Sequence, residues 1–388
     1  MANTLEEAMN VKKSLYAIRH DIHQHAESGL ELPWTVQRIT YELQKLDIPY
    51  DVIPGGIKAV LGQAAGKRIL LRADMDALPI KEKTGLAYAS QTGSMHACGH
   101  DLHATMLLGA AWLLKQHELK LQGQVIMMFQ AGEETADGAA AMIQAGILDP
   151  LPDFAVAMHI AGVEAYPSGI VLVNDGAVFA SRDEFTVTVT GSGGHGAEPH
   201  KARNPIYCAV KMISSLSDLM QNELNAEKPS VLSVCQIEAG TTANIIPEIC
   251  KFRGTLRMID DHMRQDTLNR FRQIVEGTAA AYGVIGMLSV DSSLPMLVND
   301  ETYSQKVYEW LHEGLDGLIV APMDSHFSMG SEDFSLVSAQ VPCVYLYVLS
   351  QSPPGQHYPE HNDKVVFDDH AIPYGSAVYA HIALKYLS

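Results

Sequence analysis

Val125-Ile126-Met127-Met128-Phe129 is an unbroken apolar run, and Gln130-Ala131-Gly132-Glu133-Glu134 follows it directly. A short apolar run of this kind predicts a β-strand buried on both faces, as in sheets whose strands run parallel. Residues 69–71 and 155–158 have the same character, and a helical pattern over 104–114 separates the first two runs. Strands that alternate with helices predict an α/β fold with a mostly parallel or mixed sheet flanked by helices.

The character of the chain changes near residue 182. Residues 185–190 alternate strictly, which predicts a strand with one face in solvent. Further patterns predict a helix over 205–219, strands at 231–237 and 250–257, a helix over 262–282 and a strand at 287–293. After Pro295 the chain again alternates helical patterns with apolar runs, as it does before residue 182. We therefore predict one domain formed by residues 1–181 and 297–388, interrupted by an inserted α+β domain at 182–296.

The composition is that of a folded, acidic protein. The 388 residues include 27 Lys plus Arg against 45 Asp plus Glu, for a formal net charge of −18. A field of that sign repels phosphate backbones, so no nucleic-acid partner is expected. No window approaches the roughly 18 uninterrupted apolar residues of a membrane-spanning helix, so no membrane association is expected either.

The N-terminal segment and the cysteines predict a cytoplasmic location. Residues 1–19 are charged, have helical spacing and contain no apolar signal-peptide core. The cysteines number five, which is odd and too few for a disulfide framework in a chain of this length. That usage is typical of a reducing compartment, where each cysteine is free to be core filler or a metal ligand.

Cys98-Gly99-His100 lies in the segment richest in metal-binding side chains, Met95 to His103. Thiolate sulfur and imidazole nitrogen are the ligands that zinc-like ions prefer. The single glycine just before a predicted helix allows both side chains to turn toward one point, and a helix N-terminus stabilises a thiolate. The alternative is a buried cysteine beside surface histidines.

Glu133 and Glu134 follow the strand at 125–129, at the edge of an α/β sheet where ligands gather. Neighbouring side chains of an extended chain point to opposite sides, so one glutamate can face a metal while the other faces substrate and water. A free carboxylate beside an activated water is what general-base hydrolysis requires. The alternative is a solvated acidic turn.

Three further residues complete the candidate site. His159 ends the run at 155–158, His361 lies in a polar loop before the last helix, and Asp76 follows the strand at 69–71. A histidine in these places is otherwise core filler or a solvated loop residue, and Asp76 is a candidate to orient a ligand imidazole. The five candidate ligands suit two ions that share a bridging group better than one ion. They are Cys98, His100, Glu134, His159 and His361.

These motifs resemble those of bacterial and plant amidohydrolases that include hippurate hydrolase, N-acetyl-diaminopimelate deacetylase and indole-acetyl-amino-acid hydrolase. They belong to the larger aminoacylase and carboxypeptidase family of two-metal hydrolases. The Cys-Gly-His-Asp-x-His segment is highly specific, because related branches have Asp at the position of Cys98. The similarity covers nearly the whole chain, in motifs at 19–25, 72–79, 95–103, 129–134, 158–159, 191–196, 243–247, 254–257 and 330–334.

The resemblance implies a role for each candidate. Cys98 bridges two ions, and the other four ligands complete the two shells. Glu133 is the general base and acid, and Asp76 is the orienting carboxylate. The inserted domain forms a lid and carries a dimer contact, so a homodimer or higher homo-oligomer is expected. Within that domain, His195 stabilises the oxyanion, often in the neighbouring subunit's site, while Asn244 and Arg257 contact substrate.

The chain departs from the family pattern at a few positions. Ala26 replaces the usual proline of a His-Pro-Glu segment, Ala131-Gly132 replaces Pro-Ala, and Asn204 replaces an aspartate in the lid. None of these removes a candidate ligand. His357 competes with His361 for the last ligand position, and we favour His361 because residues 369–373 follow at the family's spacing.

The sequence thus predicts a metal-dependent amidohydrolase that cleaves the amide bond of small N-acyl amino acids. Zinc or manganese is expected, with cobalt and nickel as alternatives. A dipeptidase or carboxypeptidase would use the same ions and base. A non-catalytic ligand-binding relative would typically have lost a ligand or the base, and a structural zinc protein would place its cysteines and histidines in closed four-ligand sites.

Overall fold

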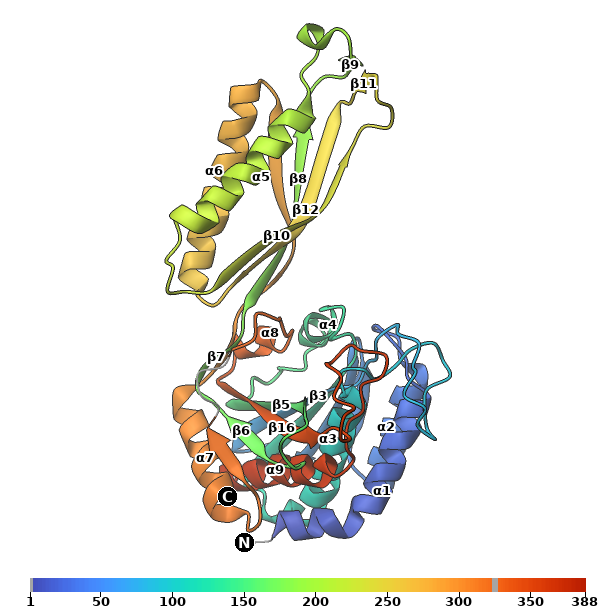
Figure 1. Cartoon of the computed structure of the whole chain (residues 1–388). Coiled ribbons are helices and arrows are strands. Elements are labelled where there is room, and N and C mark those ends of the chain that lie inside the picture. The colour runs from blue at the N-terminus through green and yellow to red at the C-terminus, as the bar shows by residue number, and fades with distance from the viewer. Residues whose placement is uncertain (1–2, 323–326) are drawn as a thin grey trace. The chain divides into compact units, whose positions relative to one another are not determined.

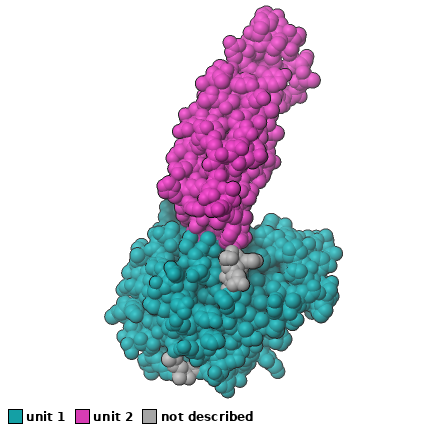
Figure 2. Space-filling model, turned by 60° about the vertical axis from the view of Figure 1, so that its left-hand side comes forward, with its two compact units in different colours: residues 1–178, 298–326, 332–388 teal, residues 179–297, 327–331 magenta. Residues whose placement is uncertain are grey.

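The structure is a computed structural model that describes residues 3–322 and 327–388 (Figure 1). The chain divides into two compact units, coloured separately in Figure 2. Unit 1 comprises Met1–Val178, Val298–His326 and Glu332–Ser388, and unit 2 comprises Phe179–Leu297 and Phe327–Ser331. The sequence contains no signal for the second passage of the chain into unit 2, at 327–331.

Unit 1 is built on one mixed sheet with the strand order β1-β2-β4-β3-β5-β16-β6-β15. Its central strands β4, β3, β5 and β16 run parallel, whereas β1, β2 and β6 run antiparallel to their inner neighbours. The predicted α/β fold with a mostly parallel or mixed sheet is confirmed. The strands are β1 (Tyr50–Ile53), β2 (Gly56–Gly62), β3 (Lys67–Asp74), β4 (Gly123–Gln130), β5 (Phe154–Val163), β6 (Val171–Val173), β15 (Val320–Pro322) and β16 (Cys343–Gln351).

Helices cover both faces of this sheet (Figure 1). On one face α3 packs between the sheet and helices α1 and α9, so it is apolar on nearly every side. On the other face α4 packs against β4 and α8. The helices are α1 (Thr4–Gln24), α2 (Pro33–Lys45), α3 (His100–Gln116), η1 (Glu118–Lys120), α4 (Gly138–Gln144), α7 (Glu301–Gly314), α8 (Ser335–Ser338) and α9 (Ala371–Tyr386).

The parallel strands bring distant polar residues to one edge of the sheet. Asp74, at the end of β3, pairs with Gln130, at the end of β4. On the other side Arg72 of β3 pairs with Ala157 of β5, so His159 lies level with Asp74. The carboxyl ends of parallel strands therefore collect the candidate residues of three separate segments, as open α/β sheets do.

Unit 2 is a four-stranded antiparallel sheet, β10-β12-β8-β13, with α5 and α6 on one face. Alternate residues of β8, such as Phe185 and Val187, are buried against these helices. The elements are β8 (Ser181–Thr190), β9 (Gly194–His195), η2 (Pro199–Lys201), α5 (Pro205–Asn222), β10 (Ser230–Ala239), β11 (Ile245–Ile246), β12 (Ile249–Met258), α6 (Asp261–Tyr282) and β13 (Ile285–Leu294). Strands β7 (Gly176–Phe179) and β14 (Leu297–Asn299) lie where the chain passes between the units.

Among residues 3–322 and 327–388, no helix combines the length and the apolar character needed to cross a bilayer. All five cysteines are free thiols, and four of them are buried.

Candidate metal centre

The turn at Cys98-Gly99-His100 directs two candidate ligands to the same place. Gly99 caps α3 in the left-handed region with φ of +83°, which glycine adopts without strain. A Cβ atom at Gly99 would lie 2.3 Å from the Cγ2 atom of Ile160, so a larger residue does not fit. Cys98 Sγ lies 3.4 Å from Nε2 of His159, which directly precedes Ile160 on strand β5.

The next residues of the same motif anchor the turn rather than join the centre. Asp101 accepts hydrogen bonds from Nε of Arg19 at 2.6 Å and lies 2.8 Å from Nδ1 of His23, both on α1. His103 accepts a hydrogen bond at Nε2 from the backbone N–H of Ile160, at 2.8 Å. Its Nδ1 must then carry the proton, which it donates to Asp74 at 2.5 Å.

Burial keeps the His103 ring neutral, because it lowers the pKa of His103 to about 4 despite the adjacent Asp74 carboxylate. The ring can therefore hold β5 and β3 together without adding charge to the centre. Asp101 and His103 were not singled out from the sequence. Their position in the sequence could have indicated them, because they lie one and three residues after His100, in the first turn of a buried helix.

Glu133 and Glu134 lie in the loop between β4 and α4, and the Asp76 carboxylate is hydrogen-bonded to the backbone of that loop. The two carboxylate oxygens of Asp76 accept hydrogen bonds from the backbone N–H groups of Glu133 and Glu134, at 3.1 and 3.2 Å. Oδ1 of Asp76 also lies 3.4 Å from Nδ1 of His100. The Glu134 carboxylate lies 3.4 Å from Nε2 of His361 and 4.0 Å from Nε2 of His100.

The five candidate ligands meet in two groups that share Cys98. In each group one ligand atom per residue lies within 4.8 Å of the others. The first group is Cys98, His100 and His159, and the second is Cys98, Glu134 and His361. His357 belongs to neither group, and Nδ1 of its ring lies 3.1 Å from the Ser352 hydroxyl.

The loop that carries His361 is tied directly to the cysteine segment. The backbone N–H of His361 donates to the carbonyl of Ala97 at 2.9 Å. His361 itself has φ of +64°, an uncommon conformation for a residue with a side chain. A strained backbone held by a hydrogen bond to the candidate centre is typical of functional positions.

Buried polar atoms without partners make the cluster suited to cations. Within the described residues, neither ring nitrogen of His100 nor Oε1 of Glu134 has a hydrogen-bond partner, although both side chains are largely buried. Burial also raises the pKa of the Cys98 thiol well above its usual range, an effect that nearby His100 only partly offsets. A divalent cation would satisfy these atoms and stabilise the thiolate, so the residues fit a metal site.

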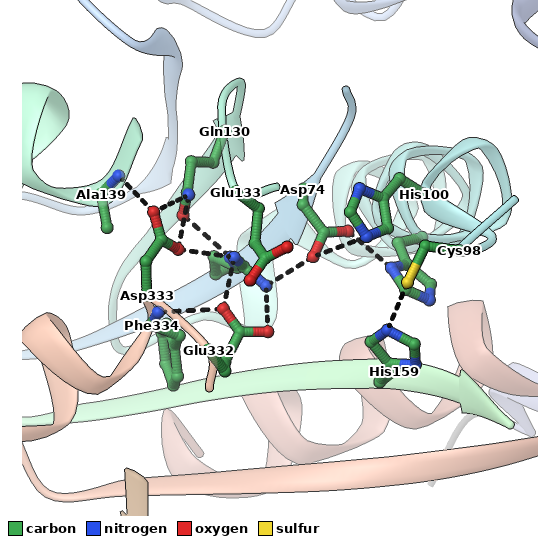
Figure 3. Close-up of polar contacts among 12 residues, drawn as sticks. Asp74, Cys98, His100, Gln130, Glu133, Ala139, His159, Glu332, Asp333 and Phe334 are labelled. Atoms are coloured by element: carbon green, nitrogen blue, oxygen red, sulfur yellow. Dashed lines mark hydrogen bonds and ion pairs between the residues drawn. The ribbon is translucent and has the colours of Figure 1, made fainter. Parts of the chain in front are cut away.

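Glu133 lies between the candidate ligands and a second cluster of acids. Figure 3 shows its carboxylate between His100 on one side and Glu332 and Asp333 on the other. Burial, and then the negative charges of Glu332 and Asp333, raise the pKa of Glu133 well above that of an ordinary glutamate. A raised pKa suits a group that takes up and releases a proton near neutral pH.

His195 and Asn244 are neighbours within unit 2. Strand β9 pairs His195 with Ile245 of β11, and the backbone N–H of Gly196 donates to the carbonyl of Asn244 at 2.8 Å. Both side chains are exposed. Pairing of β9 with β11 therefore brings the two residues close together.

Arg257 lies on strand β12 of the four-stranded sheet, near the end of that strand that is remote in sequence from β11. It pairs with Arg182 at the start of β8, whereas Ile249 at the other end of β12 pairs with Thr190. About 26 Å of strand separates Ile249 from Arg257. Arg257 also donates to the carbonyl of Met329 at 2.9 Å. Within unit 2 of one chain, Arg257 is therefore too far from His195 and Asn244 to contact the same small molecule.

Comparison with known proteins assigns the chain to a family. The model of peptidase family M20/M25/M40 matches residues 70–385, which is most of the chain and includes every candidate ligand. This chain is a member of the M20 family. The predicted relationship to two-metal amidohydrolases and carboxypeptidases is thereby confirmed.

Two M20 relatives and one solved structure illustrate the range of similarity. Thermostable carboxypeptidase 1 of Saccharolobus solfataricus is 31% identical over 378 residues, covering 95% of this chain and 94% of the relative. N-acetylcysteine deacetylase of Bacillus subtilis is 32% identical, covering 95% and 96%. The crystal structure of the Bacillus subtilis YXEP protein, a dinuclear metal binding peptidase from the M20 family, has a TM-score of 0.83, with 29% identity and coverage of 98% and 99%.

Proposed function

We propose that this M20 chain hydrolyses the amide bond of small N-acyl amino acids with the help of two divalent metal ions. The observation that carries the proposal is the meeting of Cys98, His100, Glu134, His159 and His361 in two groups that share Cys98. The Glu133 carboxylate lies outside these two groups, but one of its oxygens lies within 4.8 Å of candidate ligand atoms of His100 and Glu134. Relatives named for deacetylation of N-acetylcysteine support the substrate class.

The ligand roles follow from the two groups. Cys98 is common to both, which supports its assignment as the bridging ligand, with His100 and His159 on one side and Glu134 and His361 on the other. The N–H at Nδ1 of His159 donates to its neighbour's carbonyl at 2.6 Å, so Nε2 carries the lone pair that a metal needs. Zinc or manganese suits this mixed sulfur, nitrogen and oxygen set, and cobalt and nickel are alternatives.

The chain's own residues handle the protons. Bound divalent ions would supply Lewis acidity that makes a water acidic near neutral pH and polarises the substrate carbonyl. Glu133 takes the proton of the attacking water and later delivers it to the leaving amine nitrogen. Asp76 accepts hydrogen bonds from the backbone N–H groups of Glu133 and Glu134, which holds the backbone of the base beside that of a candidate ligand.

The remaining roles concern unit 2 and the assembly. We assign the inserted domain, predicted at 182–296, as a lid that also forms a dimer contact, with His195 stabilising the oxyanion and Asn244 contacting substrate. Arg257 is the second substrate contact. Its distance from His195 supports an arrangement in which a homodimer, or a higher homo-oligomer, supplies the two from different subunits. The five free cysteines support a cytoplasmic location.

A hydrolysis screen tests the proposal. Purified chain is freed of metal, reloaded with zinc or manganese, and assayed on N-acetyl-, N-benzoyl- and indole-acetyl-amino acids. We expect release of the free amino acid only after reloading, with about two ions bound per chain. Binding of two ions without turnover of any substrate would point to a non-catalytic relative.

A carboxypeptidase is the second candidate, because thermostable carboxypeptidase 1 is as similar as the deacetylase. It would use the same ligands and the same base, since the bond cleaved is again an amide. Adding N-benzyloxycarbonyl dipeptides and free dipeptides to the screen distinguishes the two. Faster cleavage of the peptide bond than of N-acyl amino acids would favour the carboxypeptidase.

A further inference from the structure

The loop that carries Glu133 and Glu134 is tied at both ends by a single carboxylate from a distant part of the chain. Gln130 is the last residue before the loop, and Ala139 is the second residue of α4, just after it. Nε2 of Gln130 donates to both oxygens of Asp333, at 2.7 and 2.8 Å. The backbone N–H of Ala139 donates to Oδ2 of Asp333 at 2.9 Å.

Arg72 orients this carboxylate from within the sheet. Its guanidinium donates to Asp333 at 3.1 Å, to Oε1 of Gln130 at 3.0 Å and to Glu332 at 2.8 Å. The same guanidinium donates to Asp74 at 2.7 Å, and Asp74 in turn binds His103. Arg72, Gln130 and Asp333 are all fully buried, so their hydrogen bonds do not compete with water.

The two ends of the loop also lie too close together to separate freely. A Cβ atom at Gly138 would lie 1.6 Å from the carbonyl oxygen of Ala131. The N–H groups of Asp137 and Gly138 both donate to the carbonyl of Gly132, at 3.1 Å. The loop therefore folds back on itself, and Asp333 links its two ends through hydrogen bonds to Gln130 and Ala139.

We propose that Asp333 is a positioning residue that sets the distance of the Glu133 carboxylate from the metal-binding side chains. The inference rests on the proposed hydrolase function for its effect on turnover, but not for its effect on the loop. Asp333 shares its cluster with Glu133 and Glu332 without belonging to either ligand group that contains Cys98. Its two oxygens accept four hydrogen bonds from three donors, Gln130, Ala139 and Arg72, which a carboxylate satisfies and a side-chain amide does not.

We call the hydrogen bonds from Gln130 and Ala139 to Asp333 the Asp333 brace. Exchanging the acid and the amide between positions 333 and 130 tests it. Asp333→Asn turns an amide N–H toward the Gln130 amide N–H and toward a second donor, which is Ala139 or Arg72 depending on the flip of the amide. Gln130→Glu sets two carboxylates against each other. The double variant, Asp333→Asn with Gln130→Glu, restores a donor and an acceptor across the same contact. Asp183→Asn is the matched control, because Asp183 is an equally buried aspartate that binds an arginine, Arg264, within unit 2.

Hydrogen–deuterium exchange of the metal-free full chain gives the readout that does not depend on activity. In Asp333→Asn we expect the peptide covering 131–139 to exchange roughly tenfold faster, the factor that one lost buried hydrogen bond gives. The double variant should return toward the wild-type rate, and Asp183→Asn should leave this peptide unchanged. If Asp333→Asn does not fold, Gln130→Glu carries the same comparison.

Steady-state kinetics of the metal-loaded chain complete the test. We expect Asp333→Asn to lower kcat roughly 10- to 100-fold with two ions still bound and KM little changed, and the double variant to recover part of that loss. Unchanged loop exchange in both single variants, or a double variant no better than its parents, would overturn the proposal. A wild-type chain that hydrolyses no substrate would defeat the proposed function, while the exchange result would still decide the brace.

Discussion

Asp76 and His100 lie with Oδ1 and Nδ1 only 3.4 Å apart, while the same carboxylate holds the backbone N–H groups of Glu133 and Glu134. One buried side chain thus contacts both the ring of a candidate ligand and the loop that carries the proposed base. A carboxylate beside the free nitrogen of a ligand imidazole fixes the tautomer and the orientation of the ring.

Asp76→Asn should weaken metal binding and slow turnover together. The introduced amide N–H would face the backbone N–H of Glu133 or Glu134, and the ring of His100 would lose its carboxylate. We expect the metal Kd to rise by about 10–100-fold, measured by competition with a chelating dye. Asp51→Asn, on the exposed strand β1, is the control. An unchanged Kd in Asp76→Asn would show that Asp76 does not orient the ligand.

Glu133→Gln should separate catalysis from metal binding. Glutamine keeps the size of the side chain but cannot take up the water proton, so kcat should fall by roughly 10²–10⁴. Metal content, measured by elemental analysis, should stay at the wild-type value. Glu134→Gln is the informative comparison, because it should lose metal as well as activity. Near-normal turnover in Glu133→Gln would remove Glu133 from the role of general base.

Cys98→Ala should lose bound metal, because Cys98 is the residue common to both ligand groups. Peroxide should have a similar effect on the wild-type chain, since an oxidised sulfur is a poor ligand, and a reductant should protect activity. Cys208→Ala removes another buried thiol, in unit 2, and should keep both metal and activity. The bridging assignment is wrong if Cys98→Ala retains two ions.

Gly138→Ala should destabilise the loop that carries Glu133. The new Cβ atom would lie 1.6 Å from the Ala131 carbonyl oxygen, which has to move. We expect the free energy of unfolding in urea to fall by about 1–3 kcal/mol, with a loss of activity. Gly277→Ala in α6 meets no atom within 4 Å and should be neutral or slightly stabilising. Equal stability of the two variants would contradict the close approach.

His381 should make unit 1 sensitive to mild acid. Burial lowers the pKa of His381 to about 4, although Nε2 donates to the Trp310 carbonyl. The unfolded chain takes up this proton near pH 6.5, so stability falls as the pH drops from about 6.5 to 4, by at most about 1.4 kcal/mol per pH unit. His381→Gln should flatten that decline in urea midpoints measured against pH. The exposed His262→Gln should not.

The local chemistry of the sequence was enough to predict the fold class and the family. The apolar runs at 125–129 and 155–158 predicted buried strands, because they have no polar face and are shorter than a typical buried helix. The ligand candidates were visible because Cys98, His100 and the glutamate pair are rare residue combinations directly beside such strands. Their convergence followed from the rule that parallel strands share one edge.

Only the tertiary structure decided how these residues are held. The family's spacing already favoured His361 over His357, but only the structure shows how His361 is held. Its backbone N–H donates to the carbonyl of Ala97, which is more than two hundred residues away in the chain. The brace from Asp333 to Gln130 and Ala139 spans a similar distance. Contacts of this kind arise when buried donors and acceptors on separate segments must satisfy one another, and local periodicity carries no record of those partners.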